Sequence, residues 1–324
     1  MSQPFVLAHI SDVHLGPLPR LGMRHWNVKR TLGWLNWTRT RRVAHRPEVL
    51  AQLLADMAEQ APDHIAVTGD LINIGLPDEY AAAARWLEEL GSPTRVSLVP
   101  GNHDIYTRLR GDSGVARWAD YMTSGVDGAE ERGKVWSLAR FPWVRRIGTL
   151  ALVGVNSAVP TRPLRAIGHV GEEQLARLAS VLQALASEPV TRVVLIHHPA
   201  LPGQASPAKA LTDAPALTAV LERHGVELVL HGHNHRSMLA FRQGPAGEIA
   251  FVGVPSASLA IARHREDLAR YHLYRLLPGD RWAPIEMIGR GLASPDGPVV
   301  EIERRWLVPD RARPVSLPGT VGST

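Results

Sequence analysis

Three histidines lie within five residues at His231-Gly232-His233-Asn234-His235. The apolar run 226–230 before them is typical of a short buried strand. The three imidazoles therefore follow the C-terminal end of a strand, which is where open α/β sheets bind their ligands. Because neutral imidazole is the most common side-chain ligand of metal ions, this stretch predicts a metal site. Taken alone, the pentapeptide is equally compatible with a surface loop.

Polar residues also follow four other apolar runs that we interpret as strands. Each group alone has an ordinary explanation as a turn or a loop, but the occurrence of all five in this order is hard to attribute to chance. The five groups are Asp12-Val13-His14, Gly69-Asp70, Gly101-Asn102-His103-Asp104, His197 and Gly232-His233-Asn234-His235. We therefore interpret them as parts of one site.

The composition limits the kind of metal that such a site can hold. The chain has 324 residues, of which 45% are hydrophobic and 21% charged, and it contains no cysteine. These values are ordinary for a globular protein, and the lack of cysteine excludes disulfides and thiolate ligands. A metal must then be held by His, Asp, Asn or Glu, which suits Mn, Fe, Zn, Co or Mg.

The start of the chain bears on where the protein is located. The apolar run 5–10 is too short for a signal peptide, and no run approaches the roughly 18 apolar residues of a membrane span. We expect a cytoplasmic protein, with peripheral contact to the inner membrane through residues 17–46 as an additional option.

The patterns around the five groups predict an α/β fold. Runs 4–10, 64–68 and 94–99 are typical of strands, and the periodic segments 47–60 and 78–90 between them are typical of helices. This alternation indicates βαβ units. Further strands are expected at 143–147, 150–155, 193–196, 226–230, 237–241, 249–254, 271–276, 282–288 and 299–306, and further helices at 172–186 and near 214–223. We expect one domain over 1–308, with a β-rich part at 237–308, and a disordered tail at 309–324.

Together, these motifs resemble those of the calcineurin-like metallophosphoesterase superfamily, which are D-x-H, G-D, G-N-H-[DE], H and G-H-x-H. All of them are present in order, and the resemblance covers roughly residues 4–256. It implies a four-layer αββα sandwich of two mixed β-sheets flanked by helices. It also implies two divalent or transition metal ions (Mn, Fe, Zn or Co) and attack on phosphorus by a hydroxide that bridges them.

The resemblance also assigns roles to individual residues. The first metal would be held by Asp12, His14, Asp70 and His235, and the second by Asp70, Asn102, His197 and His233. His103 resembles the family's non-ligand histidine, which contacts the phosphate or protonates the leaving oxygen, and Asp104 would orient its ring. We expect His198 to face the substrate and His231 to pack behind the ligands.

Residues 17–46 form a basic, Trp-rich insertion after the first motif. No acid occurs between residues 13 and 47, where eight Lys or Arg are found, and the rest of the chain has a balance of −3. In a helix with about 100° per residue, the aliphatic side chains and the tryptophans fall on opposite sides. The two sides are Val28, Leu32 and Leu35, and Trp26, Arg30, Trp34 and Trp37. We therefore predict a lid that packs its aliphatic side on the body and uses Arg30, Trp34 and Trp37 to bind substrate, with burial of both sides as the alternative.

The motifs leave the substrate open, because one fold serves many substrates. We favour a small anionic phosphodiester of the cyclic-nucleotide type, because the motif spacing is compact and Gly171, Gln174 and Leu175 resemble a helix opening in that branch. The first alternative is a hydrolase of lipid headgroups or lipid A precursors, which the basic apolar insertion would suit. A nuclease ranks last, because no dimerising or DNA-capping module is evident. A scaffold without activity is disfavoured, because all seven ligand positions are filled.

Overall fold

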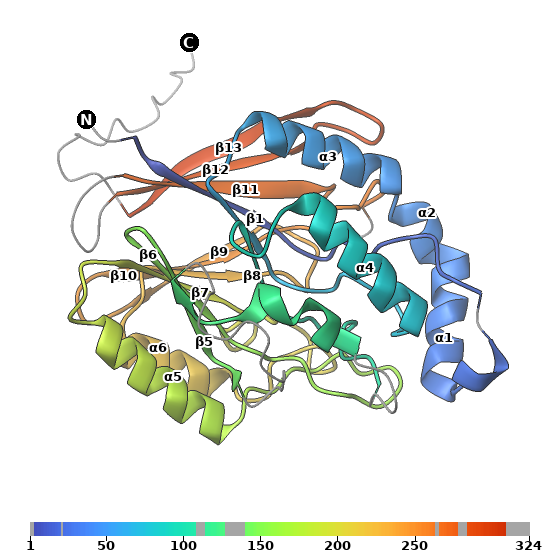
Figure 1. Cartoon of the computed structure of the whole chain (residues 1–324), viewed down its shortest axis with the longest axis horizontal. Helices are drawn as coiled ribbons and strands as arrows, with labels where there is room; N and C mark the ends of the chain where they lie inside the picture. The colour runs from blue at the N-terminus through green and yellow to red at the C-terminus, as the bar shows by residue number, and fades with distance from the viewer. Residues whose placement is uncertain are drawn as a thin grey trace, which may run out of the picture.

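The computed structural model describes residues 3–20, 22–107, 114–126, 140–262, 266–277 and 284–308. Two mixed β-sheets stack face to face, and helices cover their outer faces (Figure 1). The predicted four-layer sandwich is therefore confirmed. The tail at 309–324 and the start of the strand expected at 282–288 lie outside the described residues.

The first sheet contributes three parallel strands whose C-terminal ends carry metal-ligand motifs. Its order is β13-β12-β11-β1-β2-β3. The strands are β1 (Phe5–Ile10), β2 (His64–Val67), β3 (Val96–Leu98), β11 (Arg270–Leu276), β12 (Ile285–Leu292) and β13 (Val299–Val308). Helices α3 (Pro47–Glu59) and α4 (Pro77–Leu90) connect the parallel strands. Strand β11 runs antiparallel to β1, which makes the sheet mixed.

The second sheet carries the remaining motifs on β7 and β8. Its order is β4-β5-β6-β7-β8-β10-β9. The strands are β4 (Gly125–Val126), β5 (Trp143–Ile147), β6 (Leu150–Gly154), β7 (Thr191–Leu195), β8 (Leu228–His231), β9 (Met238–Gln243) and β10 (Glu248–Gly253). Helices α5 (Glu172–Leu185) and α6 (Ala214–His224) pack together beside this sheet. A 3₁₀ helix, η3 (Gly114–Met122), lies beside α4.

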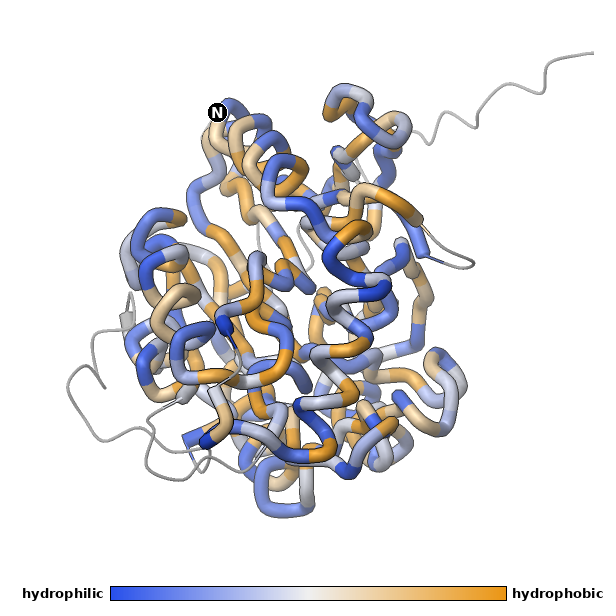
Figure 2. The backbone as a smooth tube through the Cα atoms, turned by 90° about the vertical axis from the view of Figure 1, so that its right-hand side faces the viewer, coloured by the Kyte–Doolittle hydropathy of each residue, from blue (hydrophilic) through white to orange (hydrophobic). Residues whose placement is uncertain are grey.

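The alternating direction of side chains along each strand explains why the sheets are covered on both faces. In β7 and just after it, Val193 and Leu195 join the core between the sheets, whereas Val194 and Ile196 join the core beneath α5 and α6. Successive side chains of a strand point to opposite faces, so a strand buried on both sides is apolar throughout. Figure 2 shows the helices at the periphery alternating between blue and orange, as amphipathic helices that pack on a sheet should.

The insertion folds into a helical arm at the edge of the molecule (Figure 1). It consists of η1 (Met23–His25), α1 (Val28–Asn36), the π-helical turn η2 (Trp37–Arg41) and α2 (Arg42–Ala44). The Asn27 side chain caps α1 by accepting a hydrogen bond from the Arg30 amide at 2.9 Å. Each of these helices, like the others in the described residues, is too short or too polar to cross a bilayer.

The predicted orientation of the arm is wrong. Trp37 is only 4% exposed, whereas Val28 is 70% and Leu32 is 40% exposed. Trp34 packs against the apolar cluster around Ile74. Trp34 and Trp37 offer more apolar area than Val28 and Leu32, so packing these two tryptophans against the body removes more apolar area from water.

Candidate dinuclear metal centre

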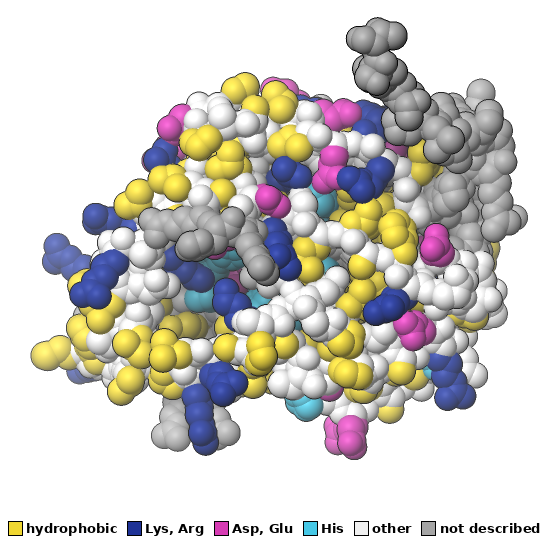
Figure 3. Space-filling model, turned by 180° about the vertical axis from the view of Figure 1, so that it is seen from behind, with side chains coloured by type: hydrophobic (Ala, Val, Ile, Leu, Met, Phe, Trp, Pro, Cys, Tyr) yellow, Lys and Arg dark blue, Asp and Glu magenta, His cyan; other side chains and the backbone are white. Residues whose placement is uncertain are grey.

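The ends of five strands converge beside one cavity of about 250 Å³, which is lined by residues that follow β2, β3 and β8. Each sheet supplies part of the site, since β1, β2 and β3 belong to one sheet and β7 and β8 to the other. The structure brings together all seven predicted ligands, namely Asp12, His14, Asp70, Asn102, His197, His233 and His235. Figure 3 shows histidine side chains at the floor of a hollow with Lys and Arg side chains around it.

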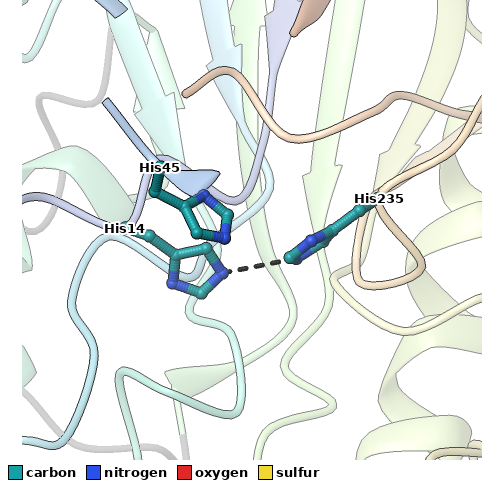
Figure 4. A group of neighbouring side chains, drawn as sticks. All are labelled: His14, His45 and His235. Atoms are coloured by element: carbon teal, nitrogen blue, oxygen red, sulfur yellow. Dashed lines mark hydrogen bonds between the residues drawn. The ribbon is translucent and has the colours of Figure 1, made fainter. Parts of the chain in front are cut away.

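The donor atoms of the first metal position surround one point. Oδ1 of Asp12 lies 3.2 Å from Nε2 of His235, and Nε2 of His14 lies 3.3 Å from the same nitrogen and 3.9 Å from Oδ2 of Asp70. Figure 4 shows the His14 and His235 rings facing each other across this point. An ion with bonds of about 2.0–2.2 Å keeps neighbouring donors roughly 3.0–3.5 Å apart, so these residues fit a metal ion.

The second metal position has the same spacing and shares Asp70. Nε2 of His197 lies 3.4 Å from Oδ2 of Asp70, 3.1 Å from Oδ1 of Asn102 and 3.3 Å from Nδ1 of His233. The same Asp70 oxygen therefore faces both positions, as a carboxylate that bridges two cations would. Each position draws ligands from both sheets.

Hydrogen bonds fix the opposite atoms of the ligands. The Asp12 carboxylate accepts a hydrogen bond from the His233 amide at 2.8 Å, and the Asp70 carboxylate accepts one from the His103 amide at 2.7 Å. Each histidine predicted as a ligand places its other ring nitrogen near an oxygen, which is typical of metal-binding histidines. The pairs are His14 with Ile72 O (3.3 Å), His197 with Thr68 O (2.6 Å), His233 with Lys209 O (2.9 Å) and His235 with a Glu266 carboxylate oxygen (3.7 Å).

The backbone at the ligands is strained. Five of the seven predicted ligands have a positive φ, a conformation that non-glycine residues rarely adopt. They are Asp12 (53°), His14 (46°), Asp70 (56°), His233 (69°) and His235 (53°). Gly232 is required by close approach, because a Cβ there would collide with the side chains of Ser11 and Asp12. Such strain persists where the surrounding structure imposes it, and it concentrates at functional sites.

Comparison with known proteins identifies the family. The family model described as "Calcineurin-like phosphoesterase" matches residues 5–237, which include all seven predicted ligands. The chain belongs to this family. As a calcineurin-like phosphoesterase, it is a metal-dependent phosphoric ester hydrolase, and enzymes of this family use a dinuclear metal centre.

Individual relatives of this phosphoesterase are distant. It is 27% identical to a "Probable cyclic nucleotide phosphodiesterase" of Synechococcus sp., with 78% of this chain and 80% of that protein aligned. It is also 27% identical to the "Glycerophosphodiester phosphodiesterase GpdQ" of Enterobacter lignolyticus, with 74% of each chain aligned. A dimetal phosphatase from Danio rerio shares the fold, with a TM-score of 0.62 and 14% identity over 95% of this chain and 99% of that one.

The buried carboxylates of the phosphoesterase site favour the binding of positive charge. Burial alone lowers the pKa of His197, but the Asp70 and Asp12 carboxylates outweigh burial and raise it to about 9. Burial raises the pKa of Asp70, and His197 and His103 outweigh it and lower that pKa. The carboxylates thus stabilise positive charge in the site, and binding of a metal ion would replace protons there.

His103 lines the cavity beside the ligands, as predicted for a non-ligand histidine. Its Nδ1 contacts the Asn73 carbonyl, and its ring stacks on Tyr106 with centroids 5.5 Å apart. The prediction that Asp104 orients this ring is wrong. The buried Asp104 carboxylate instead accepts hydrogen bonds from the backbone amides of Asp70, Leu71, Ile72 and Gly101 at 2.8–3.3 Å. Four backbone donors fix this carboxylate in the loop.

The prediction that His198 faces the substrate is also wrong. His198 is fully buried, with Nδ1 2.8 Å from Ser157 Oγ and Nε2 3.2 Å from the Ala166 carbonyl. Its ring lies 4.4 Å from that of His233, so it packs behind a ligand. His231 is likewise buried, as expected.

The residues of the insertion that were predicted to bind substrate lie away from the cavity. The Arg30 guanidinium donates hydrogen bonds to the carbonyls of Ile74 and Gly75, and Trp34 and Trp37 pack on the body. Other residues of the arm line the cavity instead, namely Asn36, Thr40, Arg41, Ala44 and His45. Sequence reasoning missed Arg41 and His45. Their spacing of four residues, which puts two side chains on one side of a helix, was the available signal.

Proposed function

We propose that this phosphoesterase hydrolyses a small anionic phosphodiester. Two adjoining cavities carry the proposal. The cavity of about 250 Å³ over the ligands extends toward Leu259 and Glu266, and one of about 500 Å³ extends toward Leu32 and Leu164. Both are lined by Asn36, Arg41, Asn102, His103, Ala166 and Lys209. A phosphate at this shared wall has space for an organic group on either side, which a diester needs and a monoester does not.

Two bound metal ions would supply a nucleophilic hydroxide at neutral pH and charge to hold the phosphoryl oxygens. The chain supplies further groups around them. Arg41 and Lys209 line both cavities and place positive charge beside a bound phosphate. His103 uses Nδ1 to contact the Asn73 carbonyl, which leaves Nε2 to face the phosphate. Burial and Arg41 lower the pKa of His103 to about 3, so Nε2 must first gain a proton, which the negative phosphate favours, before it delivers one to the leaving oxygen.

The second cavity supports an organic group of mixed character. Leu32, Tyr106 and Leu164 give it apolar surface, while Lys29 and Arg165 give it positive charge. Both bacterial relatives carry the name of a phosphodiesterase, one a "Probable cyclic nucleotide phosphodiesterase" and the other a glycerophosphodiester phosphodiesterase, which supports a diester substrate here.

The test is a substrate panel measured with Mn²⁺. It contains bis-p-nitrophenyl phosphate, p-nitrophenyl phosphate, cyclic AMP and glycerophosphocholine. We expect kcat/KM for at least one diester to exceed that for the monoester by about tenfold or more, which corresponds to about 1.4 kcal/mol of transition-state stabilisation. A preference for p-nitrophenyl phosphate over every diester would contradict the proposal.

A second candidate, a lipid phosphodiester, is favoured by the exposed side of the arm. Met23 is 91% exposed, and Trp26, Val28, Leu32 and Val43 are also exposed. The segment that carries them has eight cations and no acid. In Figure 3, hydrophobic and basic side chains lie side by side along this edge. Apolar side chains among cations suit the surface of an anionic membrane, and Leu32 links this surface to the second cavity.

Vesicle sedimentation tests this candidate. The protein should bind vesicles that contain phosphatidylglycerol more tightly than pure phosphatidylcholine vesicles, and the double variant Val28→Glu/Leu32→Glu should lose this binding. The matched control is Val300→Glu/Ile302→Glu, which alters two exposed apolar residues of β13. Equal binding by both double variants would contradict a role for the arm at membranes.

A further inference from the structure

His45 is a buried histidine that the motifs of the family do not include. It follows α2 at the end of the insertion, is 4% exposed and lines the metal cavity. Its ring centroid lies 4.8 Å from that of His14 and 5.5 Å from that of His235 (Figure 4). The insertion thus delivers a third imidazole to the first metal position.

The position of His45 is fixed by the segment 256–260. Its Nδ1 lies 2.9 Å from Ser258 Oγ. On either side of it, the Arg46 amide donates to the Ser258 carbonyl at 2.9 Å and the Ala260 amide to the Ala44 carbonyl at 2.7 Å. These bonds form a short antiparallel bridge that holds the ring before any ion binds, which is how supporting residues prepare a metal ligand.

The free nitrogen of His45 faces the same point as two predicted ligands. Because Nδ1 contacts Ser258, Nε2 is the nitrogen available to the cavity. One nitrogen each of His14, His45 and His235 lie within 4.8 Å of one another. Donors on one ion are separated by at most about 4.4 Å, so only a small movement would complete the set. Burial, with His235 and Arg41, lowers the pKa of His45 well below its usual value, and the neutral ring is the form that binds metals.

We propose that His45 is a fifth protein ligand of the metal ion held by Asp12, His14, Asp70 and His235. That ion would then have three imidazole ligands, whereas the ion held by Asp70, Asn102, His197 and His233 has two. Imidazole suits Zn, Fe and Co better than Mg. The first position should therefore bind transition metals more tightly than the second. This inference depends on the metal centre and is independent of the preference for diesters.

Metal binding by two variants tests the proposal. His45→Leu removes the donor at similar volume, and Ser258→Ala leaves the ring but removes its support. The controls are His64→Leu and Ser97→Ala, because His64 is also a buried histidine beside a serine hydroxyl (2.8 Å) but lies at the start of β2, away from the ligands. The readouts are metal content after dialysis, the affinity for Co²⁺ by titration and the visible spectrum of the Co²⁺-loaded protein.

We expect His45→Leu to weaken one of the two Co²⁺ affinities by about 10- to 100-fold or more and to change the spectrum, and Ser258→Ala to weaken it by about tenfold. The two control variants should keep both ions. Two ions bound to His45→Leu with unchanged affinities and spectrum would overturn the proposal. An equal loss in the controls would overturn it too, because the effect would then reflect general destabilisation. If His45→Leu does not fold, an unchanged Ser258→Ala titration would overturn it.

Discussion

The strand-end loops and the helical arm present side chains to the same cavity in different ways. The loops hold their ligands through the backbone, with positive φ at Asp12 and Asp70 and amide hydrogen bonds to both carboxylates. The arm is a series of short helices that docks through side chains such as Arg30 and Trp34. A metal site needs ligands fixed to fractions of an ångström, whereas a substrate surface can tolerate variation. We therefore expect changes in the loops to remove metals and most changes in the arm to affect substrate binding or stability.

Asp70→Ala should have the largest effect. Asp70 faces both metal positions with one oxygen, so its loss should remove both ions and bring activity to background. Elemental analysis of the dialysed variant measures the ions directly. Full occupancy in this variant would show that Asp70 is not the shared ligand.

His103→Ala should keep both ions and lose about 10²- to 10⁴-fold in kcat for alkyl esters, as expected for a general acid. The loss should be smaller for p-nitrophenyl esters, because their leaving group needs less protonation. Steady-state kinetics on both kinds of ester measure the difference. An equal loss on both would leave phosphate positioning as the role of His103.

Arg41→Ala should keep both ions and lower kcat/KM by about 10- to 100-fold, because a hydrogen bond from a charged group contributes about 1.5–3 kcal/mol. It should also reduce the salt dependence of kcat/KM. Arg30→Ala is the matched control from the same arm, since its guanidinium contacts backbone carbonyls. If Arg30→Ala had the larger kinetic effect, the assignment of substrate contacts within the arm would have to be reversed.

Lys29 should give a smaller, pH-dependent effect. Burial lowers the pKa of Lys29 to about 8, and its Nζ donates to the Tyr106 carbonyl at 2.6 Å in the second cavity. The ammonium is charged below this pH and neutral above it, so KM for an anionic substrate should rise a few-fold between pH 7 and 9. Lys29→Met should show no such rise. A parallel rise in both proteins would place the titrating group elsewhere.

Trp37→Ala should have the smallest kinetic effect of the five. Removing a buried aromatic side chain costs about 3–5 kcal/mol, so the Tm should fall clearly while kcat/KM for a small nitrophenyl diester changes little. Thermal unfolding measures the first and steady-state kinetics the second. If Trp37→Ala left the Tm unchanged and raised KM, Trp37 would be a substrate contact, as the sequence had predicted.

The layers, and the gathering of the polar motifs at one edge of the sheets, could be predicted because strand ends are informative. Parallel strands place their C-terminal ends at one edge, so residues such as Asp12 and Asp70 had to meet. Which side of the arm packs on the body could not be predicted. Helical periodicity shows that the two sides of a helix differ, but it does not show which of them is buried. The Asp104 contacts depend on loop amides that no pattern specifies. The four-residue spacing of Arg41 and His45 places both on one side of a helix, but His45 is held by Ser258, more than two hundred residues away, so this spacing could not place it beside the predicted metal ligands.

Because each metal position draws ligands from both sheets, the site does not exist until the sheets have docked. Asp12 follows β1 and His235 follows β8, so the first ion would cross-link strands of different sheets that lie far apart in the chain. Metal uptake would therefore come late in folding, and an ion bound to the folded state alone would stabilise it by RT ln(1 + [M]/Kd). Chelators should then act as mild denaturants of this protein, with loosening that begins between the two sheets.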